Sequence, residues 1–249
     1  MLDYDLTIPD GATEGDTVVV LLHGRGSHKG DLQALGPVFP EDWTLVTPQA
    51  PYPGAEWGYG PGWAWYRYVQ EDQLVAETLT DSLAKVDDLL AALPEILGFI
   101  PGRIVLGGFS QGGTMSVAYA MSRPGAVVAA LNFSGFVADS VVLPTSEDAD
   151  AATPIFWGHG TADPNIPFHL AIKGRERLTE AGIPLVAMDY GIGHWMVPDE
   201  IHDAVAMVES QRRYRPGSDS AYPVSSAYPA PVTARPPSPD PRTRTAPSQ

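Results

Sequence analysis

The feature that most constrains the fold is an apolar run that leads directly into a serine flanked by glycines. Residues 103–109 read RIVLGGF, which predicts a buried strand, and Ser110 follows at once within the segment GFSQG. Residues 112–121 are small or apolar and suit a helix. A turn this sharp needs glycine at its flanks and projects the serine away from the backbone. The segment predicts a nucleophilic serine; a glycine-rich turn with a solvated serine is the alternative.

Apolar strands alternate with helices through most of the chain. Strands are expected at 3–8, 17–22, 43–47, 103–109, 127–133, 154–157 and 185–190, and helices at 31–35, 71–97, 112–121, 167–181 and 198–213. Right-handed crossovers between such strands give a mostly parallel sheet with helices on both faces. In the helix at 71–97, leucine and valine recur every three or four residues, and Pro94 is expected to kink or end it.

Three reactive side chains each follow a predicted strand end: Ser110, Asp163 and His194. The loop His23-Gly24-Arg25-Gly26 does the same. Ligands bind outside the carboxyl ends of parallel strands, so we expect these four loops to meet at one edge of the sheet.

A serine hydroxyl needs a base within hydrogen-bond reach, and that base needs an orienting acid. The chain order serine, aspartate, histidine accompanies this motif on the expected fold, which favours His194 as the base. The other five histidines are assigned to helices or to loop shaping: His23, His28, His159, His169 and His202.

The orienting acid is expected between the serine and the histidine. Asp163 is the first choice because it follows the strand at 154–157, and Asp139, after the preceding strand, is the second. Asp189 lies within a strand, too near His194 to be placed freely.

Two backbone N–H groups are expected to stabilise the developing oxyanion, which is often the largest catalytic effect. One belongs to Gln111, directly after the nucleophile, and the other is expected from the early glycine-rich loop, at Arg25. The Arg25 side chain has two readings, an anion-binding group that selects acidic substrates or a partner in a local ion pair.

Residues 49–68 are rich in aromatic side chains interleaved with glycine and proline, and they follow neither a helical nor a strand period. We expect this loop to build a wall of a substrate pocket; rings folded onto the core are the alternative. The residues expected to bind substrate are Trp57, Trp63, Trp65, Tyr66 and, beside the base, Trp195.

Composition excludes several classes of function. The chain of 249 residues has no cysteine, so disulfides, thiolate metal sites and a cysteine nucleophile are ruled out. The net charge of −15 disfavours nucleic acid and anionic membranes as partners. No basic leader or long apolar run is present, so no membrane insertion and a cytoplasmic location are expected. We expect one catalytic domain over 1–215 and a disordered Pro/Ser/Thr-rich tail over 216–249.

Five segments resemble the phospholipase/carboxylesterase family of α/β-hydrolases, which includes the acyl-protein thioesterases. They are LLHGRG at 21–26, PQAP at 48–51, GGFSQGG at 107–113, GHGTAD at 158–163 and GH at 193–194. The resemblance implies an α/β-hydrolase fold without a large cap domain, acting on esters or thioesters with no metal or cofactor. It implies the triad Ser110, Asp163 and His194, with Arg25 and Gln111 as oxyanion-hole donors.

Two departures from the family pattern bear on the substrate rather than on the reaction. Many members have leucine where Arg25 stands, and the aromatic loop is unusually rich in tryptophan. The expected partner is a small ester, acyl or lysophospholipid substrate, with the protein a monomer or homodimer. The alternatives are a silent binding protein on the same fold, a peptidase or a perhydrolase.

Overall fold

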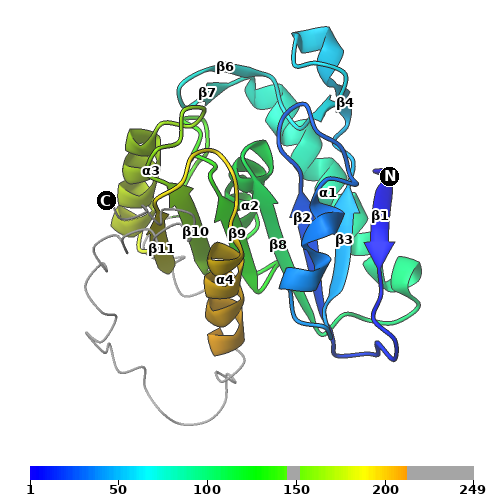
Figure 1. Cartoon of the computed structure of the whole chain (residues 1–249). Coiled ribbons are helices and arrows are strands. Elements are labelled where there is room, and N and C mark those ends of the chain that lie inside the picture. Colours follow the sequence, from blue (N-terminus) through cyan, green and yellow to red (C-terminus); the bar gives the residue numbers. More distant parts are fainter. Residues whose placement is uncertain (145–151, 212–249) are drawn as a thin grey trace, which may run out of the picture.

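A seven-stranded sheet forms the centre of the molecule (Figure 1). The computed structural model describes residues 1–144 and 152–211, so the expected tail over 216–249 lies outside the described residues. The strand order is β1-β3-β2-β8-β9-β10-β11; β1 runs antiparallel to β3 and the other neighbours are parallel. The strands are β1 (Tyr4–Thr7), β2 (Thr17–Leu22), β3 (Thr44–Pro48), β8 (Arg103–Phe109), β9 (Ala129–Phe133), β10 (Ile155–Gly160) and β11 (Leu185–Tyr190).

Helices cover both faces of this sheet because its buried strands are apolar on both sides. The helices are α1 (Ala76–Leu97), α2 (Gln111–Ser122), α3 (Phe168–Glu180) and α4 (Pro198–Gln211), with 3-10 turns η1 (Leu32–Val38) and η2 (Gly54–Trp57). Val18 and Val20 of β2 pack in one core with α1 and α2, and Val19 packs in another with α4 and η1. Helix α3 shares a third core with α2 and β10.

A long connection between β3 and α1 follows the carboxyl end of β3. It contains small hairpins formed by β4 (Tyr52–Pro53) with β5 (Trp63–Ala64) and by β6 (Tyr68–Gln70) with β7 (Gln73–Leu74). In the described part of the chain, no large cap domain covers this edge of the sheet (Figure 1). Among the described residues, none of the helices combines the length and apolar character needed to cross a membrane.

The expected start of helix α1 is wrong, whereas its expected end at Leu97 is confirmed. Helix α1 begins at Ala76 rather than near residue 71, because the preceding residues pair as the β6–β7 hairpin, with Glu71 at φ 47° in its turn. Pro94 does not end α1, which continues to Leu97 and stops at Gly98 with φ 77°. A proline near the last turn leaves only one backbone acceptor unmatched, so the packed helix tolerates it.

Candidate active site

Ser110 stands in a strained turn between β8 and α2. Its φ of 55° and ψ of −113° are unusual for a residue with a side chain, a conformation that persists only where the surroundings enforce it. A Cβ on Gly112 would lie 1.8 Å from the Leu22 carbonyl oxygen, so this flank must be glycine. The Ser110 N–H donates to the Phe133 carbonyl at 2.8 Å, which anchors the turn to β9.

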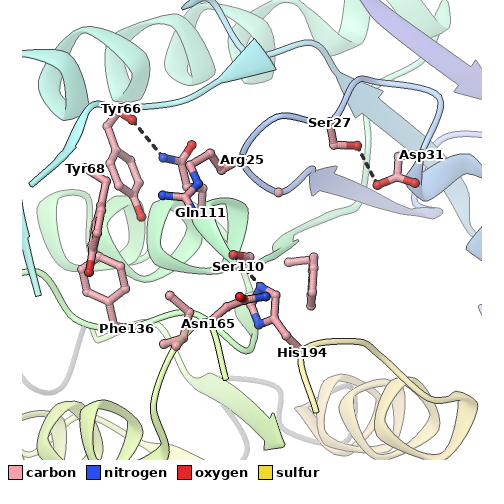
Figure 2. Close-up of a pocket in the computed structure, with 13 residues that line it drawn as sticks. Arg25, Ser27, Asp31, Tyr66, Tyr68, Ser110, Gln111, Phe136, Asn165 and His194 are labelled. Carbon is pink, nitrogen blue, oxygen red and sulfur yellow. Dashed lines mark hydrogen bonds between the residues drawn. The ribbon is translucent and has the colours of Figure 1, made fainter. Parts of the chain in front are cut away.

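A chain of hydrogen bonds joins the serine to a histidine and an aspartate, and Figure 2 shows its Ser110–His194 link. The Ser110 hydroxyl lies 3.0 Å from His194 Nε2, and His194 Nδ1 lies 2.6 Å from Asp163 Oδ2. His194 follows β11 and Asp163 follows β10, so parallel neighbours carry them to the same edge. With Nδ1–H donated to the carboxylate, Nε2 is left to accept the serine proton.

Asp163 is ionised in a buried position. Burial alone would raise the pKa of this carboxyl, but the hydrogen bond from His194 and those from the Ile166 and Asn165 N–H groups outweigh burial and lower the pKa below its usual value. The two N–H donors lie 2.9 Å and 2.8 Å from Oδ1. The acid therefore faces the imidazole as a carboxylate, held in one orientation.

The alternative acids lie elsewhere. Asp139 is exposed, and its N–H donates to the Asp72 carbonyl, away from the pocket. Asp189 pairs with Arg175 at 2.6 Å. The structure therefore brings the first-choice acid to the base and leaves the other two apart.

Two buried histidines shape the surrounding loops. Burial lowers the pKa of His23 to about 4, so its ring is neutral at pH 7 and accepts the Ala50 N–H at Nε2, at 3.1 Å. His159 is also buried, which lowers its pKa, and its Nε2–H donates to the Ile166 carbonyl at 2.9 Å. The second bond supports the loop that carries Asp163.

The two expected oxyanion donors border the same cavity as the serine. Neither the Arg25 nor the Gln111 N–H donates a hydrogen bond to another described residue. The Gln111 N–H opens α2, where the helix dipole adds partial positive charge. Its side chain accepts the Trp65 N–H at 3.0 Å and donates to the Tyr66 carbonyl at 2.9 Å, which fastens the aromatic segment over the serine.

This cavity has a volume of about 330 Å³ and opens over Ser110. Phe109 packs on the His194 ring at 4.7 Å between ring centres. The remaining lining residues come from the five segments that follow β2, β3, β8, β9 and β10: Gly24, Arg25, Ser27, Asp31, Tyr66, Tyr68, Gln111, Phe136, Asn165 and Ile166. The described residues contain no group of three His, Asp or Glu side chains arranged as metal ligands.

Of the five aromatic residues expected to bind substrate, only Tyr66 lines this cavity. Trp65 is fully buried in the core, where its Nε1–H donates to the His23 carbonyl at 2.9 Å. Trp57 packs against Tyr52, and Trp195 is 55% exposed. Trp63 is held in the β4–β5 hairpin, with its backbone paired to Ser27.

Tyr68 belongs to the segment 49–68 that was expected to form a pocket wall, although it was not among the five named residues. Sequence reasoning missed other side chains of the cavity wall, among them Phe136, Asn165 and Ile166. Two of them had a usable signal, because Asn165 and Ile166 follow Asp163 closely and are brought to the edge with it.

The chain is similar to known proteins over most of the described residues. A family model described as phospholipase/carboxylesterase matches residues 5–210. Acyl-protein thioesterase 1 of Gibberella zeae is 35% identical over 120 residues, which cover 46% of this chain and only 50% of that protein. The chain thus spans about half the length of this relative.

A longer match joins the chain to acyl-protein thioesterase 1 of Cryptococcus neoformans, 30% identical over 214 residues that cover 74% of this chain and 88% of that protein. The solved structure of esterase PE8 is 27% identical with a TM-score of 0.68, covering 84% of this chain and 98% of that one. The fold is that of the α/β-hydrolases, and the chain belongs to the phospholipase/carboxylesterase family.

Proposed function

We propose that this protein is a serine hydrolase that cleaves carboxylic esters, with Ser110 carrying the acyl group between two half-reactions. The observation that carries the proposal is the hydrogen-bonded chain from Ser110 through His194 to Asp163. This arrangement of hydrogen bonds activates a serine hydroxyl, which must lose its proton as it attacks. Family membership supports ester chemistry, and the names of the relatives extend the proposal to thioesters.

In acylation, Ser110 Oγ attacks the carbonyl carbon of the ester while His194 Nε2 takes the hydroxyl proton. Asp163 stabilises the imidazolium that forms and keeps the ring in the productive tautomer. The same Nε2–H then protonates the departing alkoxide, so the alcohol leaves on the side of the cavity that His194 occupies. The acyl group remains as an ester of Ser110.

The negative charge on the carbonyl oxygen develops between the Arg25 and Gln111 N–H groups. Both are free to donate, and the helix dipole behind Gln111 adds to the stabilisation. Loss of one such donor typically lowers kcat by about 10²- to 10³-fold. In deacylation a water molecule replaces the alcohol, His194 removes its proton, and Ser110 is regenerated with release of the acid.

A labelling experiment tests the nucleophile. A fluorophosphonate probe should modify the wild-type protein at Ser110, and Ser110→Ala should lose both labelling and nearly all hydrolysis of 4-nitrophenyl esters. The control is Ser122→Ala, which removes an exposed hydroxyl at the far end of the same helix. Undiminished turnover by Ser110→Ala would sink the proposal.

The same experiment separates the other classes of function. A silent binding protein would neither label nor turn over ester, and a peptidase or perhydrolase would prefer anilide or peroxide-generating substrates to esters. We further propose a cytoplasmic protein that acts as a monomer or homodimer on small ester or acyl substrates without a cofactor. Size-exclusion chromatography with light scattering tests the oligomeric state.

A further inference from the structure

Arg25 is the sole arginine or lysine among the described residues that line the cavity. No carboxylate of the described residues forms an ion pair with it, although the chain has 30 acidic residues against 15 basic ones. Most other basic side chains in the described part are paired with carboxylates: Lys29, Lys85, Arg103, Arg123, Lys173 and Arg175. An arginine left without a carboxylate in such an acidic protein is available to an anion from outside.

Two tyrosine rings hold this guanidinium in place. Its Cζ lies 4.9 Å from the centre of the Tyr59 ring and 5.7 Å from that of Tyr68, within the range of cation–π attraction. The Tyr68 N–H donates to the Tyr59 hydroxyl at 2.9 Å, so the two rings form one support. A side chain fixed in advance loses less conformational entropy when a ligand binds.

The backbone of this loop is fixed as well. Gly26 has a φ of 77°, and a Cβ there would lie 2.6 Å from the Tyr59 carbonyl oxygen, so the loop packs directly on Tyr59. The Gly26 N–H donates to the Trp63 carbonyl at 2.8 Å. Loop and aromatic segment therefore hold the Arg25 side chain at the cavity wall.

The position of Arg25 indicates which half of the ester it meets. In Figure 2, Ser110 lies between Arg25 and His194. Because His194 must protonate the leaving oxygen, the alcohol occupies the side of His194 and the acyl group extends toward Arg25. The carboxylate that lines the cavity, Asp31, lies apart from Arg25 and accepts the Ser27 hydroxyl at 2.7 Å.

Resting on the function proposed above, we propose that Arg25 selects esters whose acyl group ends in a carboxylate, the half-esters of short dicarboxylic acids. The guanidinium offers a planar fork of donors that matches a carboxylate. The cavity, at about 330 Å³, is at the small end for ligand sites and suits a short acyl chain. Tyr66 and Phe136 would pack against the methylene groups between the two carbonyl carbons.

The test compares three esters by kcat/KM at neutral pH. The first is monoethyl glutarate, the second is its isostere with a carboxamide in place of the carboxylate, and the third is carboxymethyl butanoate, which carries the carboxylate on the alcohol. Wild-type protein should prefer the half-ester to the carboxamide by about tenfold, the low end for a charge-assisted hydrogen bond. The third ester should not be hydrolysed with a higher kcat/KM than the carboxamide ester.

Substitution of Arg25 should remove this preference. In Arg25→Gln the ratio of kcat/KM for half-ester over carboxamide should fall to near one, and in Arg25→Lys part of it should remain because the charge persists without the fork. The ratio is the measurement because any effect on the shared oxyanion site cancels in it. Arg67→Gln is the matched control: it removes an exposed arginine outside the cavity and should leave the ratio unchanged.

Three outcomes would overturn the inference while leaving the esterase intact: no preference in the wild type, a preference that survives Arg25→Gln, or a larger gain from the carboxylate on the alcohol. Folded wild-type protein that hydrolyses 4-nitrophenyl esters but none of these three would also overturn the inference alone, whereas failure to label with the fluorophosphonate probe and to hydrolyse any ester would contradict the proposed function.

Discussion

Asp163 keeps its charge because three hydrogen-bond donors converge on a carboxyl that burial would otherwise neutralise. The loop between Asp163 and Ile166 folds its own N–H groups back onto Oδ1, and His194 takes Oδ2. An amide at position 163 would keep this shape, yet it would carry no charge and would favour the wrong imidazole tautomer.

We therefore expect Asp163→Asn to lower kcat by about 10⁴-fold with little change in KM, as steady-state ester hydrolysis would show. Asp139→Asn, which alters the exposed second-choice acid, is the control and should behave as wild type. A larger loss of kcat in Asp139→Asn than in Asp163→Asn would show that Asp139, and not Asp163, is the acid that orients His194.

At the scale of residues, local patterns predicted the reactive groups better than the cavity walls. The glycines around Ser110 fix the backbone conformation of its turn. Asp163 and His194 follow the ends of strands, and apolar runs in the sequence predict where those strands end. Whether a ring faces a cavity depends on what packs behind it. The same aromatic segment sends Trp65 into the core and Tyr66 to the cavity wall, a choice made by distant partners such as Gln111.

At the scale of elements, helix α4 places an acid against the sheet. Glu200 is fully buried and fills the space over Gly158 of β10, where a Cβ would lie 2.1 Å from its Oε1. Burial raises the pKa of Glu200 to about 8, so the carboxyl is protonated at neutral pH in the folded protein. In the unfolded chain the same group ionises near its ordinary value of 4.5.

This difference makes stability depend on pH. Between about pH 4.5 and pH 8 unfolding releases a proton from Glu200, so the free energy of unfolding falls as pH rises, by a total on the order of 5 kcal/mol. Glu200→Gln does not titrate and should lose this part of the slope. Urea denaturation of both proteins from pH 5 to pH 9 measures it; parallel curves would contradict the raised pKa.

Element boundaries were predictable only where the signal was local. Gly98 ends α1 with a positive φ, and a glycine at this position in the sequence predicts such a helix end. The start of α1 was misplaced because residues 71–74 carry helix-compatible side chains, but the pairing of β6 with β7 satisfies their backbone instead. Pairing between two strands can override the helical preference of a single segment, and the pattern of one segment does not reveal which other segment it pairs with.

At the scale of the molecule, every residue assigned to the site lies within the region that the sheet and helices span. The last described helix ends at Gln211, and the family match ends at residue 210. The division into a catalytic unit over 1–215 and a tail over 216–249 stays a prediction, since the tail lies outside the described residues.

A chain that ends at residue 215 should therefore retain the kcat/KM of the full chain on a neutral ester and unfold at the same temperature. Parallel ester assays and calorimetry of the two proteins measure this. A loss of activity or a lower Tm in the shorter chain would show that residues 216–249 contribute to the catalytic unit.

The order of the strands makes hydrolysis a reporter of complete folding. The Ser110–His194 bond spans 84 residues of sequence and the Asp163–His194 bond spans 31. Among the described residues, β11, which leads to His194, is an edge strand that pairs with β10 alone. Parallel pairings between segments far apart in sequence form slowly, because the chain must lose loop entropy before the new contacts can stabilise it. A refolding chain would accordingly become compact before it becomes active, and the rate at which ester hydrolysis recovers would measure how fast β11 pairs with the sheet.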